Sequence, residues 1–565
     1  MQSGQFYSRG KIPGKTLFVA LFFILFTVYL LTDTFDFVHF YTYLFRVKGL
    51  FKFSASLFLY TGLVFSTTLL VTSRHLFLKI LSFVLLIFTL TMEASYLIIN
   101  GYGFTFTEAS ISLKETAFIM DAITTFFPKV WFVLPSVLIF AFLLFWISHY
   151  YLPKVSWKLS VPVSLFFLSL AYFVLKGTGG QQTYPTMFKI PILMVYAVNN
   201  PVYMGPRDIV PVSPVRLPAY RHIIYLVDES VRGDFITLNN AREPVAPFLV
   251  SVSGRICNYG IMSAGGNFSA NSQLILRSGV KSDFFPDTAQ RSLRIPDILQ
   301  YAKKAGYYTI YLDGQKNVLQ NYMKEPDTKY IDFYKGIPEH YEKRDSIDFK
   351  LADELVKLMA DTARMTFTYF VKMGAHFHYE RYYPPEQRIY TPAMKLGELN
   401  NDREKMVNSF RNVVHWNVDH FFYYLLNKLG SRKDYIILYT SDHGQTLLDH
   451  GILSTHADVR HAHPFQAMVP FFIVFPDSLQ KKNFRYVSEN YNHLTHFNIF
   501  PGILTLMGYD SGWIRQHYDP SFFDTVKTTR IFYSGMLFNK GLGYRNIFDT
   551  PEMIKVQQEL KRAGR

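Results

Sequence analysis

The sequence predicts a two-part protein, an N-terminal α-helical membrane domain with five spans followed by a C-terminal α/β domain. Long apolar runs with almost no charge fill roughly the first 175 residues. Strand-like and helix-like segments alternate after residue 220, as in an α/β sheet with helices on both faces. The 565 residues also exceed what one ordinary domain of about 100–200 residues would hold.

Five apolar stretches approach the roughly 20 residues that a helix needs to cross a bilayer. They are roughly Thr16–Thr32, Phe53–Thr72, Leu76–Ile99, Val130–Ile147 and Leu159–Leu175. Buried helices of a soluble protein would leave this region without a polar surface. The first run shows no cleavage site and further runs follow it, so it does not resemble a removable signal peptide. We expect residues 1–176 to form a transmembrane domain.

The basic residues between the spans predict the orientation of this domain. Seven lie on the side of the N-terminus and five on the other side, which favours a cytoplasmic N-terminus. The first group is Arg9, Lys11, Lys15, Arg74, Lys79, Lys154 and Lys158, and the second is Arg46, Lys48, Lys52, Lys114 and Lys129. With five spans, everything after Leu175 is then expected outside the cytoplasm.

The overall charge and the cysteine count narrow the class of protein. A net charge of +15 suits anionic lipid headgroups or phosphate-rich substrates. Nucleic acid is not expected as a partner, because the chain has membrane spans. The chain has one cysteine, Cys257, so no disulfide can form within it and the exported domain must depend on its core.

Residues 177–220 are predicted to be a connector. The segment opens with "GTGGQQ" and later contains five prolines, at 201, 206, 211, 214 and 218. Between them, the amphipathic stretch Met187–Val198 is expected to lie along the membrane surface as an interfacial helix. Residues 221–565 then form the predicted periplasmic α/β domain.

Strand-like and helix-like segments alternate regularly in the predicted α/β domain. "HIIYLVD", "YTIYLDG", "MTFTYFVKMGAH", "DYIILYTSDHG" and "VPFFIVFP" read as strands. "RIPDILQYAKKAGY", "FKLADELVKLMADTA" and the region from Arg403 to Leu429 read as helices. In open α/β sheets, ligands bind beyond the carboxyl ends of the strands. The residues at those ends are therefore the first candidates for a functional site.

Acidic and histidine side chains follow four of the predicted strands. They are Asp228 and Glu229, Asp313, His376 and His378, and Asp442 and His443, with His450, His456, His461 and His463 further along. A single strand-end Asp is more often a helix cap or turn residue, and a lone His is more often structural. The joint pattern favours a divalent metal, above all zinc, which accepts nitrogen and oxygen ligands together.

Four blocks then reveal a family resemblance. "IIYLVDESVRGDF", "SAGGNFSANSQ", "AHFHYERYYP" and "TSDHGQTLLDHG" occur in the order typical of the alkaline phosphatase/sulfatase superfamily. With the spans before them, the chain resembles the bacterial inner-membrane phosphoethanolamine transferases over nearly its whole length. The resemblance implies a sulfatase/alkaline-phosphatase-like fold for the C-terminal domain.

The resemblance also implies a site. Glu229 matches the first metal-ligating acid of the family, and Asp442 and His443 match its ligand pair. One or two zinc ions are expected. His376 matches a histidine at a second metal position or near the phosphoryl group. The family pattern implies a further histidine just beyond "SDHG". His456 is nearest to that position but is offset by one residue, so His461 and His463 remain alternatives.

The nucleophile of the family maps onto Ser269, within "GNFSA", and would also contact the metal. Zinc bound at this site would stabilise the alkoxide of this hydroxyl. Gly265 and Gly266 would allow a tight turn before a helix whose first N–H groups face the phosphoryl oxygens. Ser263 and Ser272 are the competing hydroxyls. Asn267 and Asn271 are candidate donors to the phosphoryl oxygens.

Three departures from the family pattern stand out. The family carries threonine where this chain has Ser269, and the members closest to the lipid A-modifying branch carry several disulfides. The basic residue expected after "YLDG" has only a loose match in Lys316. The missing disulfides and the offset histidine favour a different acceptor branch. Lys316, His378 and Glu108 complete the candidate substrate-binding residues, Glu108 lying close to where the donor headgroup would enter.

The implied reaction is transfer of phosphoethanolamine from phosphatidylethanolamine to an envelope acceptor, lipopolysaccharide above all, through a phosphoethanolamine–Ser269 ester. His376 or His456 would move the protons. Three alternatives stay open: a phosphoglycerol transferase, a hydrolase of the same fold, and a non-catalytic membrane regulator. A regulator should have lost metal ligands, and this chain keeps Glu229, Asp442 and His443.

Overall fold

A computed structural model describes residues 13–547 apart from short gaps at 32–33, 115–122, 124–125, 179–182, 338–342, 397, 399–400, 453, 458–461, 528–530 and 540–542. The chain forms two compact units, Met1–Pro201 and Val202–Arg565. The predicted connector is therefore divided between them, and its helix belongs to the first unit.

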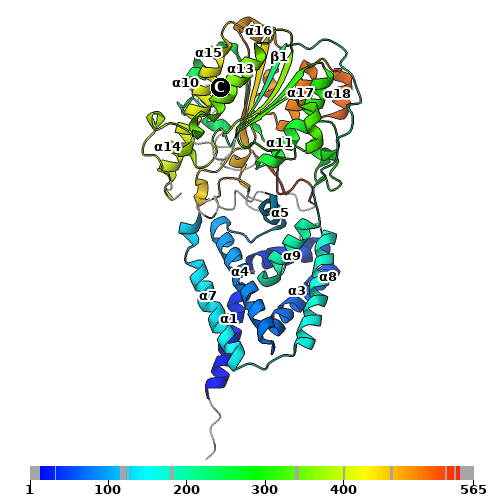
Figure 1. The fold of residues 1–565 in the computed structure, drawn as a ribbon, viewed down its shortest axis with the longest axis vertical. Coiled ribbons are helices and arrows are strands. Elements are labelled where there is room, and N and C mark those ends of the chain that lie inside the picture. Colours follow the sequence, from blue (N-terminus) through cyan, green and yellow to red (C-terminus); the bar gives the residue numbers. More distant parts are fainter. Residues whose placement is uncertain are drawn as a thin grey trace, which may run out of the picture. The chain divides into compact units, whose positions relative to one another are not determined.

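The described part of the first unit consists of helices and the loops that join them (Figure 1). Its helices are α1 (Pro13–Leu31), α2 (Thr34–Tyr43), α3 (Leu50–Val71), α4 (Leu76–Asn100), α5 (Phe106–Lys114), α7 (Val133–Tyr150), α8 (Trp157–Thr178) and α9 (Thr186–Val198). Four of them, α3, α4, α7 and α8, are long and apolar enough to cross a membrane, and they match four of the five predicted spans. The first predicted span forms α1, whose apolar part, Thr16–Leu31, is shorter.

The helix predicted at the membrane surface packs inside the first unit. α9 contacts α4, α5 and α8. Met187, Ile190 and Leu193 on α9 are buried in the apolar core of this unit. The five prolines expected to break the connector all follow the end of α9, and a further proline, Pro191, lies inside this helix. The amphipathic pattern of α9 is therefore satisfied by neighbouring helices.

One ion pair ties α9 to α4. Lys189 Nζ on α9 lies 2.6 Å from Glu93 Oε1 on α4, with side-chain exposures of 3% and 0%. The other oxygen of Glu93 accepts the backbone N–H of Phe104 at 3.2 Å, in the loop that leads to α5. Charged groups at this depth are expensive unless they are paired.

We therefore expect Glu93→Gln and Lys189→Met each to lower the thermal stability of the purified protein, because each leaves one buried charge without its partner. The double variant should lose less than the sum of the two single losses, since it leaves neither charge behind. Thermal unfolding in detergent measures this coupling. Strictly additive losses would show that the pair contributes no interaction energy.

The second unit is built around a seven-stranded sheet. Its strands are β1 (His222–Asp228), β2 (Ile256–Ser263), β3 (Tyr308–Asp313), β4 (Phe333–Gly336), β5 (Thr366–Val371), β6 (Tyr435–Ser441) and β7 (Met468–Val474), in the spatial order β2-β7-β6-β1-β5-β3-β4. β1 pairs in parallel with β5 and β6, and β3 pairs in parallel with β4 and β5. β7 is antiparallel to both β2 and β6. A small hairpin, β8 (Ile531–Ser534) and β9 (Gly543–Asn546), lies outside this sheet.

Helices cover both faces of the large sheet (Figure 1). One apolar core lies beneath α13 (Ile347–Met359), α14 (Arg403–Val414) and α15 (Phe421–Leu429), and the other beneath α12 (Ile298–Lys304) and α17 (Ile499–Leu506). The shorter helices are α10 (Pro247–Ser251), α11 (Ser269–Ser278), α16 (Ser478–Asn483) and α18 (Ser511–His517). β1, β6 and β7 are buried along their whole length, as strands of a sheet covered on both faces should be.

The helix predicted from Arg403 to Leu429 is nearly continuous. A π-helical turn, His415–His420, joins α14 to α15. π-Helical turns insert one extra residue into a helix and often occur at functional sites.

The strand directions determine where a site can form. β1, β5, β6 and β3 end at the same edge of the sheet because they run in parallel. β2 also ends at that edge, because two successive antiparallel pairings, to β7 and then to β6, restore its direction. The segments that follow β1, β2 and β6 are therefore neighbours in space although they lie far apart in the sequence.

Candidate metal and nucleophile site

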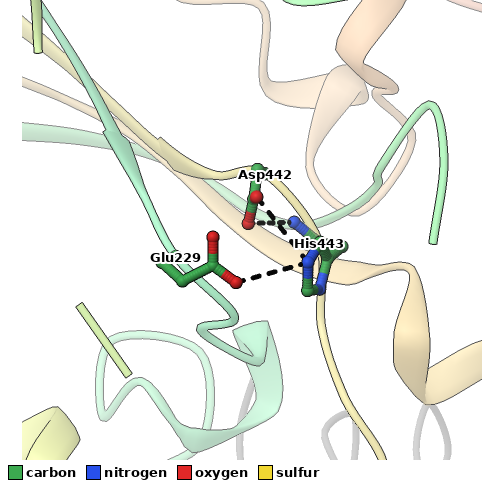
Figure 2. A group of neighbouring side chains, drawn as sticks. All are labelled: Glu229, Asp442 and His443. Carbon is green, nitrogen blue, oxygen red and sulfur yellow. Dashed lines mark hydrogen bonds and ion pairs between the residues drawn. The ribbon is translucent and has the colours of Figure 1, made fainter. Parts of the chain in front are cut away.

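Three side chains converge at this edge of the sheet. Glu229 directly follows β1, and Asp442 and His443 directly follow β6. One ligand atom from each lies within 4.8 Å of the others, and all three residues are buried. Figure 2 shows the Glu229 carboxylate pointing toward the His443 ring, with Asp442 beside it. The structure thus brings together the three predicted metal ligands.

The hydrogen bonds around the three residues leave unprotonated atoms facing one another. His443 Nδ1 lies 2.8 Å from the carbonyl oxygen of Gly444, which can only accept, so this nitrogen carries the proton. The lone pair of Nε2 then faces Glu229 Oε1 at 3.4 Å and Asp442 Oδ2 at 3.6 Å. Asp442 Oδ2 is buried and has no hydrogen-bond partner among the described residues. A buried oxygen without a partner beside two other acceptors fits a divalent cation with nitrogen and oxygen ligands.

Burial controls the protonation of this cluster. Burial and the nearby charge of Glu229 together raise the pKa of Asp442 well above its ordinary value. Burial also lowers the pKa of His443, which keeps its imidazole neutral at physiological pH. Neutral imidazole and ionised carboxylate are the forms that bind metals, so only Asp442 must lose a proton when a cation binds.

The hydroxyl of Ser269 lies against this cluster. Its Oγ donates to Glu229 Oε2 at 3.2 Å and lies 3.4 Å from His443 Nε2. The competing hydroxyls have other partners. Ser263 Oγ donates to the carbonyl oxygen of Ala264, and Ser272 Oγ bonds to the backbone of Gly266. Of these three serines, only Ser269 forms a hydrogen bond to a candidate metal ligand among the described residues.

Ser269 is the first residue of α11, which begins directly after the glycine pair. A Cβ atom on Gly265 would lie 2.5 Å from Ile275 Cδ1, and one on Gly266 would lie 2.6 Å from Asn271 Cβ. Neither glycine needs a positive φ. The expected tight turn therefore exists, but its glycines are required by the close approach of α11 side chains to the loop.

The two histidines predicted to move protons lie near the cluster. The His456 ring stacks on the His443 ring with centroids 4.4 Å apart. Burial, aided by the neighbouring His443, lowers the pKa of His456 to about 3. His376, in the loop after β5, is close enough for its charge to act on Glu229. Among the alternatives, the His463 ring lies 5.3 Å from the His450 ring, centroid to centroid, and His461 lies outside the described residues.

The other predicted site residues have the following partners. Asn267 Nδ2 donates to Gln466 Oε1 at 2.8 Å, and Asn271 Nδ2 donates to the Gly535 carbonyl at 2.7 Å, so both amides fasten the start of α11. Lys316 lies in the loop after β3, where its backbone N–H donates to Asp313. His378 Nδ1 lies 3.9 Å from Glu380 Oε1. Their roles toward a substrate remain predictions.

Glu108 lies in the first unit. It is buried near the start of α5, where its Oε2 accepts the backbone N–H of Thr105 at 2.8 Å. Burial raises the pKa of this carboxyl.

Two further residues near the cluster were missed by sequence reasoning. Gln315 Nε2 donates to Glu229 Oε2 at 2.8 Å from the loop after β3. His496 accepts the backbone N–H of Gly265 at Nδ1, and its Nε2 lies 3.0 Å from the Ser441 carbonyl, so it joins the loop before Ser269 to the end of β6. Gln315 follows a predicted strand end by two residues, a signal that could have been used. His496 follows no predicted strand.

A buried charge cluster lies directly behind Glu229. Lys372 Nζ lies 2.7 Å from Asp228 Oδ2 and 3.7 Å from Asp348 Oδ2, with no side-chain exposure above 1%. Lys372 also donates to the Asn417 carbonyl in the π-helical turn. Asp228 in turn accepts the Glu229 N–H at its side chain and the Asp442 N–H at its carbonyl oxygen. Lys372 therefore holds Asp228 in place, and Asp228 positions the candidate ligands Glu229 and Asp442.

We expect Lys372→Met to lower the free energy of unfolding by about 3–5 kcal/mol, because it leaves two buried carboxylates unpaired. Zinc affinity should also fall, by about 10–100-fold, as when groups that orient metal ligands are removed. Thermal unfolding and zinc titration measure the two effects. Lys357→Met, on the exposed face of α13, is the matched control and should change neither. Unaltered zinc affinity in Lys372→Met would contradict the positioning role.

Comparisons with known proteins agree with this geometry. A family model described as Sulfatase matches residues 221–509. The chain is similar to phosphatidylethanolamine transferase Mcr-2 of Escherichia coli, 23% identical over 308 residues, which are 52% of this chain and 55% of that protein. It is also similar to phosphoethanolamine transferase EptA of Escherichia coli (strain K12), 27% identical over 150 residues, 25% of this chain and 27% of that protein. The matched regions thus span about half the length of the first relative and less of the second.

Two solved structures share the fold. The integral membrane protein lipooligosaccharide phosphoethanolamine transferase A from Neisseria meningitidis aligns with a TM-score of 0.55 at 17% identity, over 83% of this chain and 92% of that one. The C-terminal periplasmic domain of EcEptC from Escherichia coli, in complex with Zn, aligns with a TM-score of 0.52 at 16% identity, over 61% and 98%. The first alignment includes helices as well as the α/β domain, because it extends well beyond the length of the α/β unit.

The predicted superfamily is thereby confirmed. The matching family model covers a little more than half of the 565 residues and contains Glu229, Ser269, Asp442 and His443. The chain belongs to the sulfatase family.

Proposed function

We propose that this protein transfers phosphoethanolamine from phosphatidylethanolamine to an acceptor in the cell envelope, with lipopolysaccharide, at a core sugar or lipid A, as the acceptor. The observation that carries the proposal is the position of Ser269 Oγ, 3.2 Å from Glu229 in the buried cluster with Asp442 and His443. A serine hydroxyl beside a metal site is equipped for group transfer through a covalent ester. The similarity to a phosphatidylethanolamine transferase and a phosphoethanolamine transferase supports this choice of donor.

Glu229, Asp442, His443 and Ser269 would hold the zinc ion. When bound, zinc supplies Lewis acidity that lowers the pKa of the serine hydroxyl and stabilises negative charge on the phosphoryl oxygens. The number of zinc ions, one or two, is part of the proposal.

The transfer has two steps. Ser269 Oγ attacks phosphorus, the bond from phosphorus to the glycerol oxygen breaks, and diacylglycerol leaves after taking up a proton. An acceptor hydroxyl then loses its proton and attacks the phosphoethanolamine–Ser269 ester, which restores the serine. His376 or His456 handles both protons.

Substrate binding would involve groups on several loops. Lys316 and His378 follow β3 and β5, whose carboxyl ends share the edge of the sheet with Glu229. Asn267 and Asn271 precede and follow Ser269 by two residues. Glu108, in the first unit, is a further candidate substrate-binding residue. The four long apolar helices would anchor the protein in the inner membrane, with the α/β unit in the periplasm.

The test uses purified full-length protein, phosphatidylethanolamine labelled in its headgroup, and lipopolysaccharide. We expect diacylglycerol to appear together with labelled lipopolysaccharide. Release of free phosphoethanolamine without labelled acceptor would instead identify a hydrolase, and no diacylglycerol under any metal condition would favour a non-catalytic role. Mass spectrometry of lipopolysaccharide from cells with and without the gene identifies the natural acceptor.

A further inference from the structure

A group of cations at one end of the first unit has no acidic counterpart among the described residues. Arg74, Lys154 and Lys158 are exposed, and Lys79 lies one helical turn inside α4. No aspartate or glutamate occurs in residues 1–32, 61–92 or 130–207, which include the ends of α3 and α7, the starts of α4 and α8, and the two loops that join them. We call these four residues the basic end of the bundle. Its charge must be balanced by something outside the protein.

Backbone hydrogen bonds hold the basic end together. The loop between α3 and α4 and the loop between α7 and α8 form a short parallel bridge at Ser73 and Val155. The Arg74 N–H donates to the Val155 carbonyl at 2.7 Å, and the Val155 N–H donates to the Thr72 carbonyl at 3.0 Å. Because the bridge joins the two loops, Arg74 and Lys154 are fixed as neighbours despite the repulsion between them.

Lys79 is the most unusual member. It is 1% exposed, and its Nζ donates to Ser148 Oγ at 3.3 Å and lies 5.8 Å from the centre of the Phe145 ring, both on α7. A hydroxyl and an aromatic ring solvate an ammonium but do not neutralise it. Lys154 is near enough to repel it further. Ionisable residues inside helical bundles of this kind usually serve a ligand or an ion.

Aromatic side chains place the basic end at the level of lipid headgroups. Tyr150 and Trp157, 68% and 52% exposed, lie at the end of α7 and the start of α8. Exposed tyrosine and tryptophan at helix ends are typical of the boundary between a membrane and water.

We propose that the basic end binds the phosphate of an anionic glycerophospholipid, of the phosphatidylglycerol or cardiolipin class. Charge complementarity selects this partner, since the lipid supplies the negative charge that the protein lacks there. The donor phosphatidylethanolamine fits poorly, because its ammonium would enter a wholly cationic environment. This is a second lipid site, separate from the transfer reaction, and it places a structural lipid between α4, α7 and the two bridged loops.

The test is native mass spectrometry of the full-length protein with equal amounts of phosphatidylglycerol and phosphatidylethanolamine. Wild type should retain phosphatidylglycerol preferentially, and binding should weaken by about fivefold for each cation removed. Lys79→Met tests the buried ammonium. Arg74→Gln combined with Lys154→Gln changes exposed residues only, so it decides the question if Lys79→Met fails to fold.

Lys52→Met is the matched control. Lys52 is an exposed lysine near the start of α3, about 30 Å along that helix from the basic end, and its loss should leave retention unchanged. Equal retention by wild type and the Arg74/Lys154 double variant would overturn the proposal. So would an equal loss in Lys52→Met, or no preference of wild type for phosphatidylglycerol, which would indicate general adhesion of lipid to the bundle.

Discussion

Ser269→Ala should reduce diacylglycerol release by at least ~10³-fold, as expected when a nucleophile that acts together with its partners is removed. The side chain loses the only atom that could form the ester, while its neighbours Glu229 and His443 remain. Zinc should still bind, because three of the four proposed ligands are intact. Headgroup-labelled phosphatidylethanolamine and the purified variant provide the measurement.

Two variants of the same stretch sharpen this experiment. Ser263→Ala is the matched control, because its hydroxyl bonds to the Ala264 carbonyl and not to the metal cluster; it should keep wild-type activity. Ser269→Thr should remain active, since the related enzymes that the chain resembles carry threonine at this position. Wild-type release of diacylglycerol by Ser269→Ala would show that another group attacks phosphorus.

Asp442→Asn should weaken zinc binding by more than the roughly 10–100-fold expected when a residue that only orients a metal ligand is changed, and activity should fall with it. The substitution keeps the shape of the side chain but removes the carboxylate charge that a cation would bind, at a buried Oδ2 without a hydrogen-bond partner among the described residues. Chelation of wild type should abolish activity, and added zinc should restore it. Asp361→Asn, an exposed carboxylate at the end of α13, is the control.

The pH dependence of zinc binding follows from the same residue. In the metal-free protein, burial and the charge of Glu229 raise the pKa of Asp442, so this carboxyl keeps its proton to a higher pH than usual. A binding cation must displace that proton, and zinc affinity should therefore rise with pH until the pKa of Asp442 is passed. Asp442→Asn should lose this part of the slope. Full activity of wild type stripped of metal would contradict the whole assignment.

The strand-end residues were predictable because a parallel sheet imposes a simple rule. Glu229, Asp442 and His443 directly follow buried apolar strands, so their meeting at one edge follows from the pattern alone. Gln315 was within reach of the same rule. His496 and Lys372 were not, since their contacts depend on how a distant turn and a helix pack against the sheet.

Other features required the packing to be known. The antiparallel direction of β7 cannot be read from its uniformly apolar sequence, and β4 is too short and too exposed to be recognised. The helix α9 was correctly expected, but its amphipathic pattern is compatible with a membrane surface and with neighbouring helices alike. The hydrogen bonds of the Asn267 and Asn271 amides to Gln466 and Gly535 could not be predicted, because they depend on how distant loops pack against α11; the roles of both residues toward a substrate stay predictions.

The π-helical turn between α14 and α15 has a consequence for how this protein can vary. Asn417 in that turn donates to the carbonyls of Gly374 and Tyr382, which lie on either side of His376 in the sequence. Deleting one residue from the turn would restore an ordinary helix and rotate Asn417 by about 100° away from both carbonyls. The number of residues in the π-helical turn is therefore fixed by the hydrogen bonds of Asn417 to the loop that contains His376. Insertions or deletions between residues 415 and 420 should be tolerated far less than substitutions there.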